Sequence, residues 1–85
     1  MFAYDKERQE VRKIIIDTRT DIVRISMRQF KEAEVGSKDY YYWANTIINT
    51  LTKILMDDRK VYNGLDIFYG KDLDAVRRAY KSQPK

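Results

Sequence analysis

The residues with the most evident binding chemistry in this 85-residue chain are four consecutive aromatic side chains, Tyr40 to Trp43. Successive residues of a helix lie about 100° apart, so Tyr40 and Tyr41 can face a core while Tyr42 and Trp43 point to another surface. Exposed Tyr and Trp side chains are typical of the residues that dominate protein interfaces. They can equally cover apolar surface of a neighbouring helix or subunit, or stack on a base near the phosphate-binding N-terminus of a helix.

Two arginines, Arg12 and Arg19, lie seven residues apart and interrupt an apolar surface of the first predicted helix. One interpretation is that their aliphatic stems lie along this surface while the guanidinium groups reach water or a carboxylate. The other is that the two guanidinium groups hold an anion together at a helix interface. With Tyr42 and Trp43, these arginines make up the predicted partner-binding residues.

Basic residues are concentrated in the last part of the sequence. The chain carries 17 Lys and Arg against 13 Asp and Glu, a net charge of +4, and residues 71–85 contribute +3 of it with five basic and two acidic side chains. Such a cluster attracts polyanions. Arg77, Arg78 and Lys81 are therefore the predicted contacts of a nucleic acid or nucleotide. Against this interpretation, the nearly neutral remainder of the chain offers no continuous basic track.

Side chains for catalysis or metal binding are scarce. The sequence has no Cys and no His, which excludes the usual zinc, iron–sulfur and thiol chemistries and a Ser-His-Asp triad. The pairs Asp57-Asp58 and Asp72/Asp74 are weak Mg²⁺ candidates, because such sites need converging carboxylates and a substrate phosphate. We expect no enzymatic activity, no metal and no cofactor.

Length and composition predict one domain, residues 1–85, of the globular class. With 44% hydrophobic and 35% charged residues, the chain is too apolar for disorder and too charged for a membrane protein. The longest apolar run covers residues 14–16 only, and charges occur throughout residues 1–20. These features predict a soluble, cytoplasmic protein.

Helix-breaking residues fall at 36–37, 63–70 and 82–84, which predicts helices over residues 5–34, 38–62 and 72–81. Ser37 is the expected N-cap of the second helix, and Asp72 that of the third. A heptad repeat of apolar residues runs along the second helix and stops at Asn63-Gly64, a typical helix end. Residues 65–69 are apolar and are expected to close one end of the helix pair.

The first predicted helix carries apolar side chains over an arc of about 220°, whereas one neighbouring helix covers about 100°. It therefore needs at least two partners, and a homodimer supplies the second. The predicted fold is all-α: a long antiparallel helical hairpin with a short C-terminal helix, assembled into a dimeric helical bundle. Two groups of side chains form the arc, namely Val11, Ile14, Ile15, Ile22 and Ile25, and Ile16, Val23, Met27 and Phe30.

The functional prediction is a small non-enzymatic module that binds a larger protein as an adaptor, regulator or inhibitor. Its aromatic and basic surface would consist of Tyr42, Trp43, Arg12 and Arg19. The alternative is a protein that binds nucleic acid or a nucleotide through its basic C-terminal helix and the same aromatic cluster.

Overall fold

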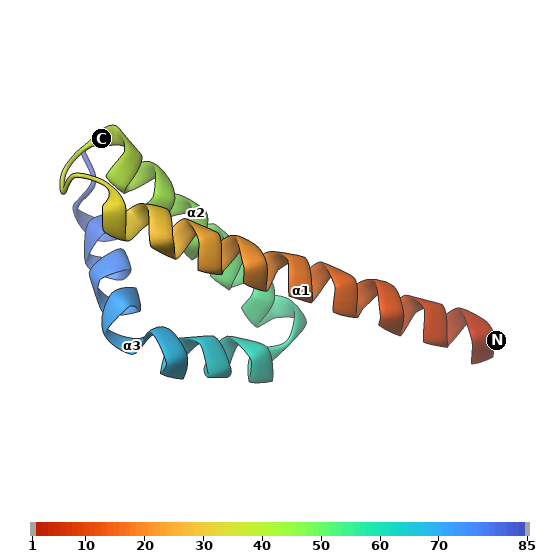
Figure 1. The fold of residues 1–85 in the computed structure, drawn as a ribbon. Helices are drawn as coiled ribbons and strands as arrows, with labels where there is room; N and C mark the ends of the chain where they lie inside the picture. Colours follow the sequence, from red (N-terminus) through yellow and green to blue (C-terminus); the bar gives the residue numbers. More distant parts are fainter. Residues whose placement is uncertain (1, 85) are drawn as a thin grey trace.

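The computed structural model describes the backbone of residues 2–84 and the side chains of residues 6–84. It contains three α-helices, α1 (Phe2–Glu32), α2 (Lys38–Asp57) and α3 (Arg59–Ser82), and no strand within the described range. The prediction of an all-helical fold is therefore confirmed, and the helices pack as a bundle (Figure 1). None of the helices in residues 2–84 has a stretch long and apolar enough to cross a membrane.

A tight turn joins α1 to α2. Gly36 has a φ of +87°, a conformation that L side chains rarely adopt, and this reverses the chain direction. Ser37 then caps α2, as predicted, because its side-chain oxygen accepts a hydrogen bond from the Tyr40 amide at 3.1 Å. As a result α2 runs back along α1 (Figure 1), and near the turn the Phe30 and Tyr40 rings stack with their centroids 4.5 Å apart.

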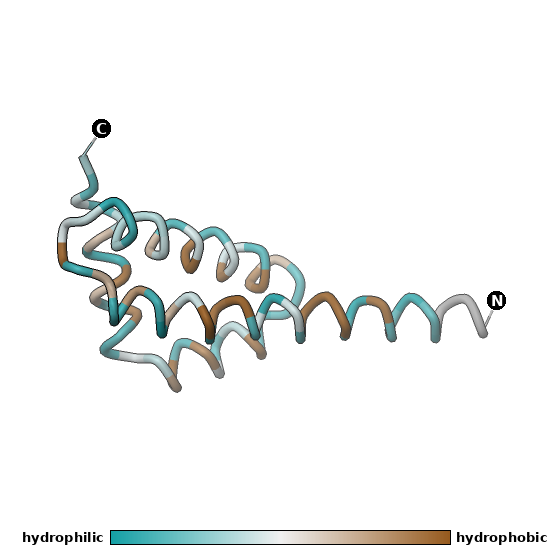
Figure 2. Tube along the Cα trace, turned by 45° about the horizontal axis from the view of Figure 1, so that its top comes forward, coloured by the Kyte–Doolittle hydropathy of each residue, from teal (hydrophilic) through white to brown (hydrophobic). Residues whose placement is uncertain are grey.

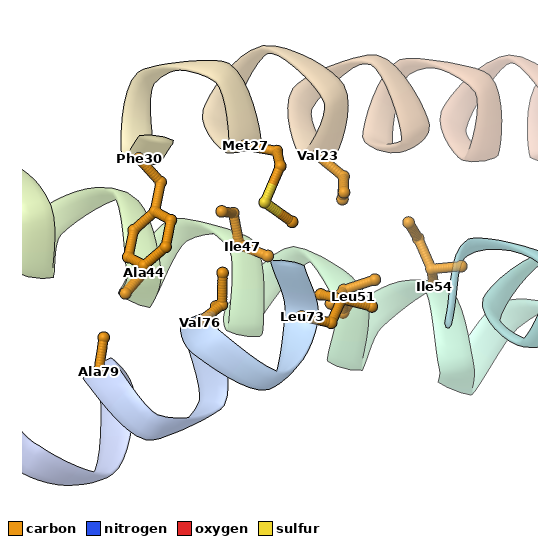
Figure 3. Packing of buried hydrophobic residues seen from close by; sticks show 10 residues of the cluster. All are labelled: Val23, Met27, Phe30, Ala44, Ile47, Leu51, Ile54, Leu73, Val76 and Ala79. Carbon is orange, nitrogen blue, oxygen red and sulfur yellow. The ribbon is translucent and has the colours of Figure 1, made fainter. Parts of the chain in front are cut away.

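The buried core combines one face of each helix, and its side chains interdigitate between the three (Figure 3). Because the apolar residues recur every three or four positions, each helix directs them to one side. The α1 members are all from the second of the two apolar groups of that helix. The core residues are Val23, Met27 and Phe30 from α1, Ala44, Ile47, Leu51 and Ile54 from α2, and Leu73, Val76 and Ala79 from α3.

The boundary between α2 and α3 differs from the predicted one. The second helix ends at Asp57 rather than residue 62, and residues 63–71, expected as a loop, belong to α3. Asp58 separates the two helices in an extended conformation, with φ −154° and ψ 100°. Its carboxylate accepts hydrogen bonds from the Lys60 and Val61 amides at 3.0 and 3.2 Å, so it starts the new helix.

Helical periodicity continues through Gly64 and Gly70 and explains why α3 is long. Tyr62, Leu65 and Tyr69 are spaced three and four residues apart, and all three pack against the core. This packing outweighs the low helix propensity of glycine, about 1 kcal/mol for each residue. Residues 65–69 thus do not form a closing loop.

Asp72 is likewise not the cap of a short helix, because it lies within α3. Its carboxylate pairs instead with the Lys31 ammonium group of α1 at 3.3 Å. Figure 1 shows that α3 bends near its middle, where Gly70 stands in the sequence, and glycine is a common cause of such bends. The part after the bend carries all the buried residues of α3 and packs on α2.

The first helix is longer than the bundle that it joins. At about 1.5 Å per residue, the 31 residues of α1 span about 46 Å and the 20 residues of α2 about 30 Å. The N-terminal part of α1 therefore projects past the other helices (Figure 1), and the molecule measures 51 × 22 × 22 Å. Hydrophobic residues continue into this projecting part (Figure 2).

Substitution of two glycines tests the extent of α3. Gly64→Ala is expected to raise the free energy of unfolding by about 0.5–1 kcal/mol, because an added Cβ inside the helix meets no atom within 4 Å. Gly36→Ala, the matched variant, is expected to lower it by about 1 kcal/mol because of the positive φ. Urea unfolding followed by circular dichroism measures both changes. Destabilisation by both variants would contradict the placement of residue 64 within a helix.

Candidate functional site

One side of α1 exposes a row of apolar side chains, which we call the α1 strip. The opposite group, with Ile16, Val23, Met27 and Phe30, is buried beneath α2. Of the two apolar groups of α1, α2 thus covers one and leaves the other in contact with solvent. The strip and its exposed fractions are Val11 54%, Ile14 63%, Ile15 41%, Ile22 39% and Ile25 49%.

The spacing of these residues explains why they share one side. From Val11 the sequence steps by four to Ile15, by three to Thr18, by four to Ile22 and by three to Ile25. This alternation keeps side chains on one face of a helix and is the pattern of helices that pack closely along their length. Ile14 widens the row. Arg8 and Gln29 occupy the next steps and bound the strip.

An open groove of about 720 Å³ lies along the projecting part of α1 and reaches the end of α2. Val11 and Ile15 supply its apolar lining, while Glu7, Arg12 and Asp57 supply charges of both signs. A mixed set of charges around apolar side chains suits an amphipathic segment better than a simple anion. The groove therefore makes this part of α1 a candidate site, and Arg12 lies on its wall.

The four residues of the predicted partner-binding surface are not brought together. Arg19 forms an ion pair with Asp57, the last residue of α2. Trp43 lies 14 residues earlier in the same helix, which places it about 21 Å away along the axis. Trp43 is half-buried against the core and meets the Tyr42 ring edge-to-face with 4.8 Å between centroids. Tyr42 is 60% exposed, so the aromatic pair and the two arginines form separate surfaces.

The three basic residues proposed for nucleic-acid contact differ in their surroundings. The Arg77 guanidinium donates hydrogen bonds to Asp66 at 2.8 Å and Tyr62 at 3.3 Å. The hydrogen bond to the Asp66 carboxylate raises the pKa of Arg77, although burial partly opposes this effect. Arg78 and Lys81 are exposed. The carboxylate of Asp66 therefore offsets the charge of one of the three.

Polar groups in the interior are satisfied within the described side chains. None of the buried side-chain nitrogen or oxygen atoms there is without a hydrogen-bond partner. Thr50, for example, donates to the Thr46 carbonyl at 2.7 Å. The described residues also contain no group of three or more acidic side chains placed to hold a metal ion.

Comparisons with protein-family models, with curated proteins and with solved structures gave no match to this chain. The site is therefore defined by its own geometry. The sequence indicates the strip residues as apolar surface that needs a partner, but none of them is among the predicted partner-binding residues Tyr42, Trp43, Arg12 and Arg19, whose role stays a prediction. The four-three spacing from Val11 to Ile25 is the signal that could have marked this row as a candidate site.

Substitutions of Arg77 and Arg78 test which of these two arginines stabilises the fold. Arg77→Gln is expected to lower the free energy of unfolding by up to about 1 kcal/mol, because it removes the ion pairs with Asp66 and Asp74 on a partly exposed surface. Arg78→Gln, which makes the same chemical change at an exposed position, is expected to leave it unchanged. Thermal unfolding at low and at high salt compares them. An equal effect of the two would show that the Arg77 contacts do not stabilise the fold.

Proposed function

We propose that this protein is a non-enzymatic protein-binding module that associates with another helix through the α1 strip. The observation that carries the proposal is the row of five half-exposed apolar side chains on one side of α1. Burying a fully exposed Val or Ile contributes about 1.5–3 kcal/mol, so covering the strip supplies several kcal/mol toward association. Exposed apolar patches of this kind mark interaction sites.

The arrangement of α1 and α2 supports this function. In our proposal they act as an antiparallel hairpin that presents the strip as a preformed surface, with the Arg19–Asp57 ion pair holding α1 where it leaves the bundle. A preformed surface loses less conformational entropy on binding. A partner would also stabilise the projecting part of α1, because a helix without tertiary packing has only marginal stability in water.

Tyr42 and Trp43 remain candidates for a second contact, through which an adaptor, regulator or inhibitor would engage a larger protein. Support comes from the exposure of Tyr42 and from the edge-to-face contact that orients the two rings. The nucleic-acid alternative has less support, since Asp66 and Asp74 offset the charge of Arg77. Arg78 and Lys81 alone make a small cationic surface.

Affinity capture with the full chain as bait tests the proposal. The lysate comes from cells that express the protein and is used with and without nuclease. We expect wild type to retain a polypeptide after nuclease treatment and Ile22→Lys to lose it, because a charge in the strip opposes burial. Asn49→Lys, which adds the same charge at an exposed position of α2, is the control and should behave as wild type.

Two results would contradict the proposal. Capture that nuclease abolishes would favour nucleic acid as the partner, and capture that Ile22→Lys leaves intact would place the binding surface away from the strip. Circular dichroism of each variant confirms that the helices are unchanged.

A further inference from the structure

We infer that the α1 strip binds the same strip of a second copy of this chain, so that two α1 helices form a short, parallel, in-register coiled coil. This inference rests on the proposed function and names the partner of its surface. Three features carry it: the spacing of the strip, its width, and the charges along its edges.

The spacing of the strip suits pairing with an identical helix. Residues at alternate steps of four and three from Val11 to Ile25 are those that meet across the axis of a two-helix coiled coil. In a parallel pair each residue of this row lies beside its own copy. Val11, Ile15, Ile22 and Ile25 then form four apolar layers, and Thr18 forms the central layer.

The width of the strip leaves room for one helix only. At about 100° per residue, the strip covers an arc of about 100° from Ile14 to Ile15, which is the arc that a single neighbour covers. On one side of this arc the surface already belongs to the contact with α2, where Ser26 and Phe30 are buried. One further helix therefore completes the coverage of α1, and the assembly that this predicts is a dimer.

The charges at the edges of the strip favour the parallel direction. Glu7 lies on one edge, and Arg12 and Arg19 lie on the other. In a parallel pair, a residue on the first edge meets the residue five positions later on the opposite edge of the second copy. Glu7 then meets Arg12 of the second copy, twice by symmetry, and Ile14 meets the stem of Arg19. An antiparallel pair would place each edge beside the same edge of the second copy, and Glu7 would then have no arginine of that copy opposite it.

A parallel pair also uses the projecting part of α1. It places the two N-terminal parts side by side, where α2 and α3 of neither copy reach (Figure 1). Val11 and Ile14, 54% and 63% exposed in the single chain, become part of an apolar contact. The bodies formed by α2 and α3 lie together at the other end of the pair.

Disulfide trapping tests the direction and register, because the chain has no natural Cys. In a parallel in-register pair, Val11→Cys places two thiols within disulfide reach across the axis. We expect this full-length variant to form a covalent dimer on mild oxidation at micromolar concentration. Lys13→Cys, about 200° around the helix from Val11, is the matched control and should not. Trapping between Val11→Cys and Ile22→Cys chains, without trapping of Val11→Cys alone, would overturn the parallel arrangement, because an antiparallel pair places these two core positions opposite each other.

Light scattering and sedimentation equilibrium test the dimer itself. Wild type should have twice the mass of one chain, and Ile22→Lys should raise the dissociation constant about tenfold or more. Thr18→Leu should lower it severalfold, because leucine suits this position of a two-helix coiled coil and a purely intrachain role for residue 18 predicts no such gain.

The outcomes for the dimer and for the proposed function are distinguishable. A wild-type mass of one chain at hundreds of micromolar protein, with no Val11→Cys trapping, would overturn the dimer. If affinity capture still depended on Ile22 in that case, the proposed function would stand with the helix of another protein as the partner. If the mass and trapping results excluded the dimer and capture did not depend on Ile22, both the dimer and the proposed function would be overturned.

Discussion

The apolar side chains of α1 cover more of its circumference than one neighbouring helix can bury. An arc of about 220° faces outward from this helix, and α2 takes only the part that contains Val23 and Phe30. The bend in α3 leaves that helix packed on α2, so it does not cover the remainder. The excess of apolar surface on one helix thus determines which side of α1 is solvent-exposed, and with it where the candidate site lies.

Much of the first half of the fold follows from local signals in the sequence. Gly36 and Ser37 specify a turn and a helix start within two residues, and the buried and exposed groups of α1 are separable by their angular positions. These signals involve residues a few positions apart, so no knowledge of the tertiary structure is needed to interpret them.

The second half of the fold was harder to predict, because tertiary packing there outweighs the local signals in the sequence. Asn63-Gly64 is a conventional helix end, yet Leu65 and Tyr69 gain enough from packing on the core to keep the helix continuous. Asp58 follows an acidic residue at the end of a helix, where negative charge is unfavourable, and its value as a cap for the next helix was missed. The ion-pair partners of Arg19 and Arg77 lie 38 and 11 residues away, so these contacts could not be deduced from spacing.

A single residue, Asp58, forms the joint between α2 and α3. Helix connections usually take about 2–8 residues, but here Asp58 alone serves both ends: its amide donates to the Ile54 carbonyl at 2.7 Å and its carboxylate caps α3. Inserting one residue would turn the apolar face of α3 by about 100° relative to α2 and carry Leu73 and Val76 out of the core. The length of this joint therefore fixes the rotation of α3 about its own axis, and with it which side chains of α3 reach the core.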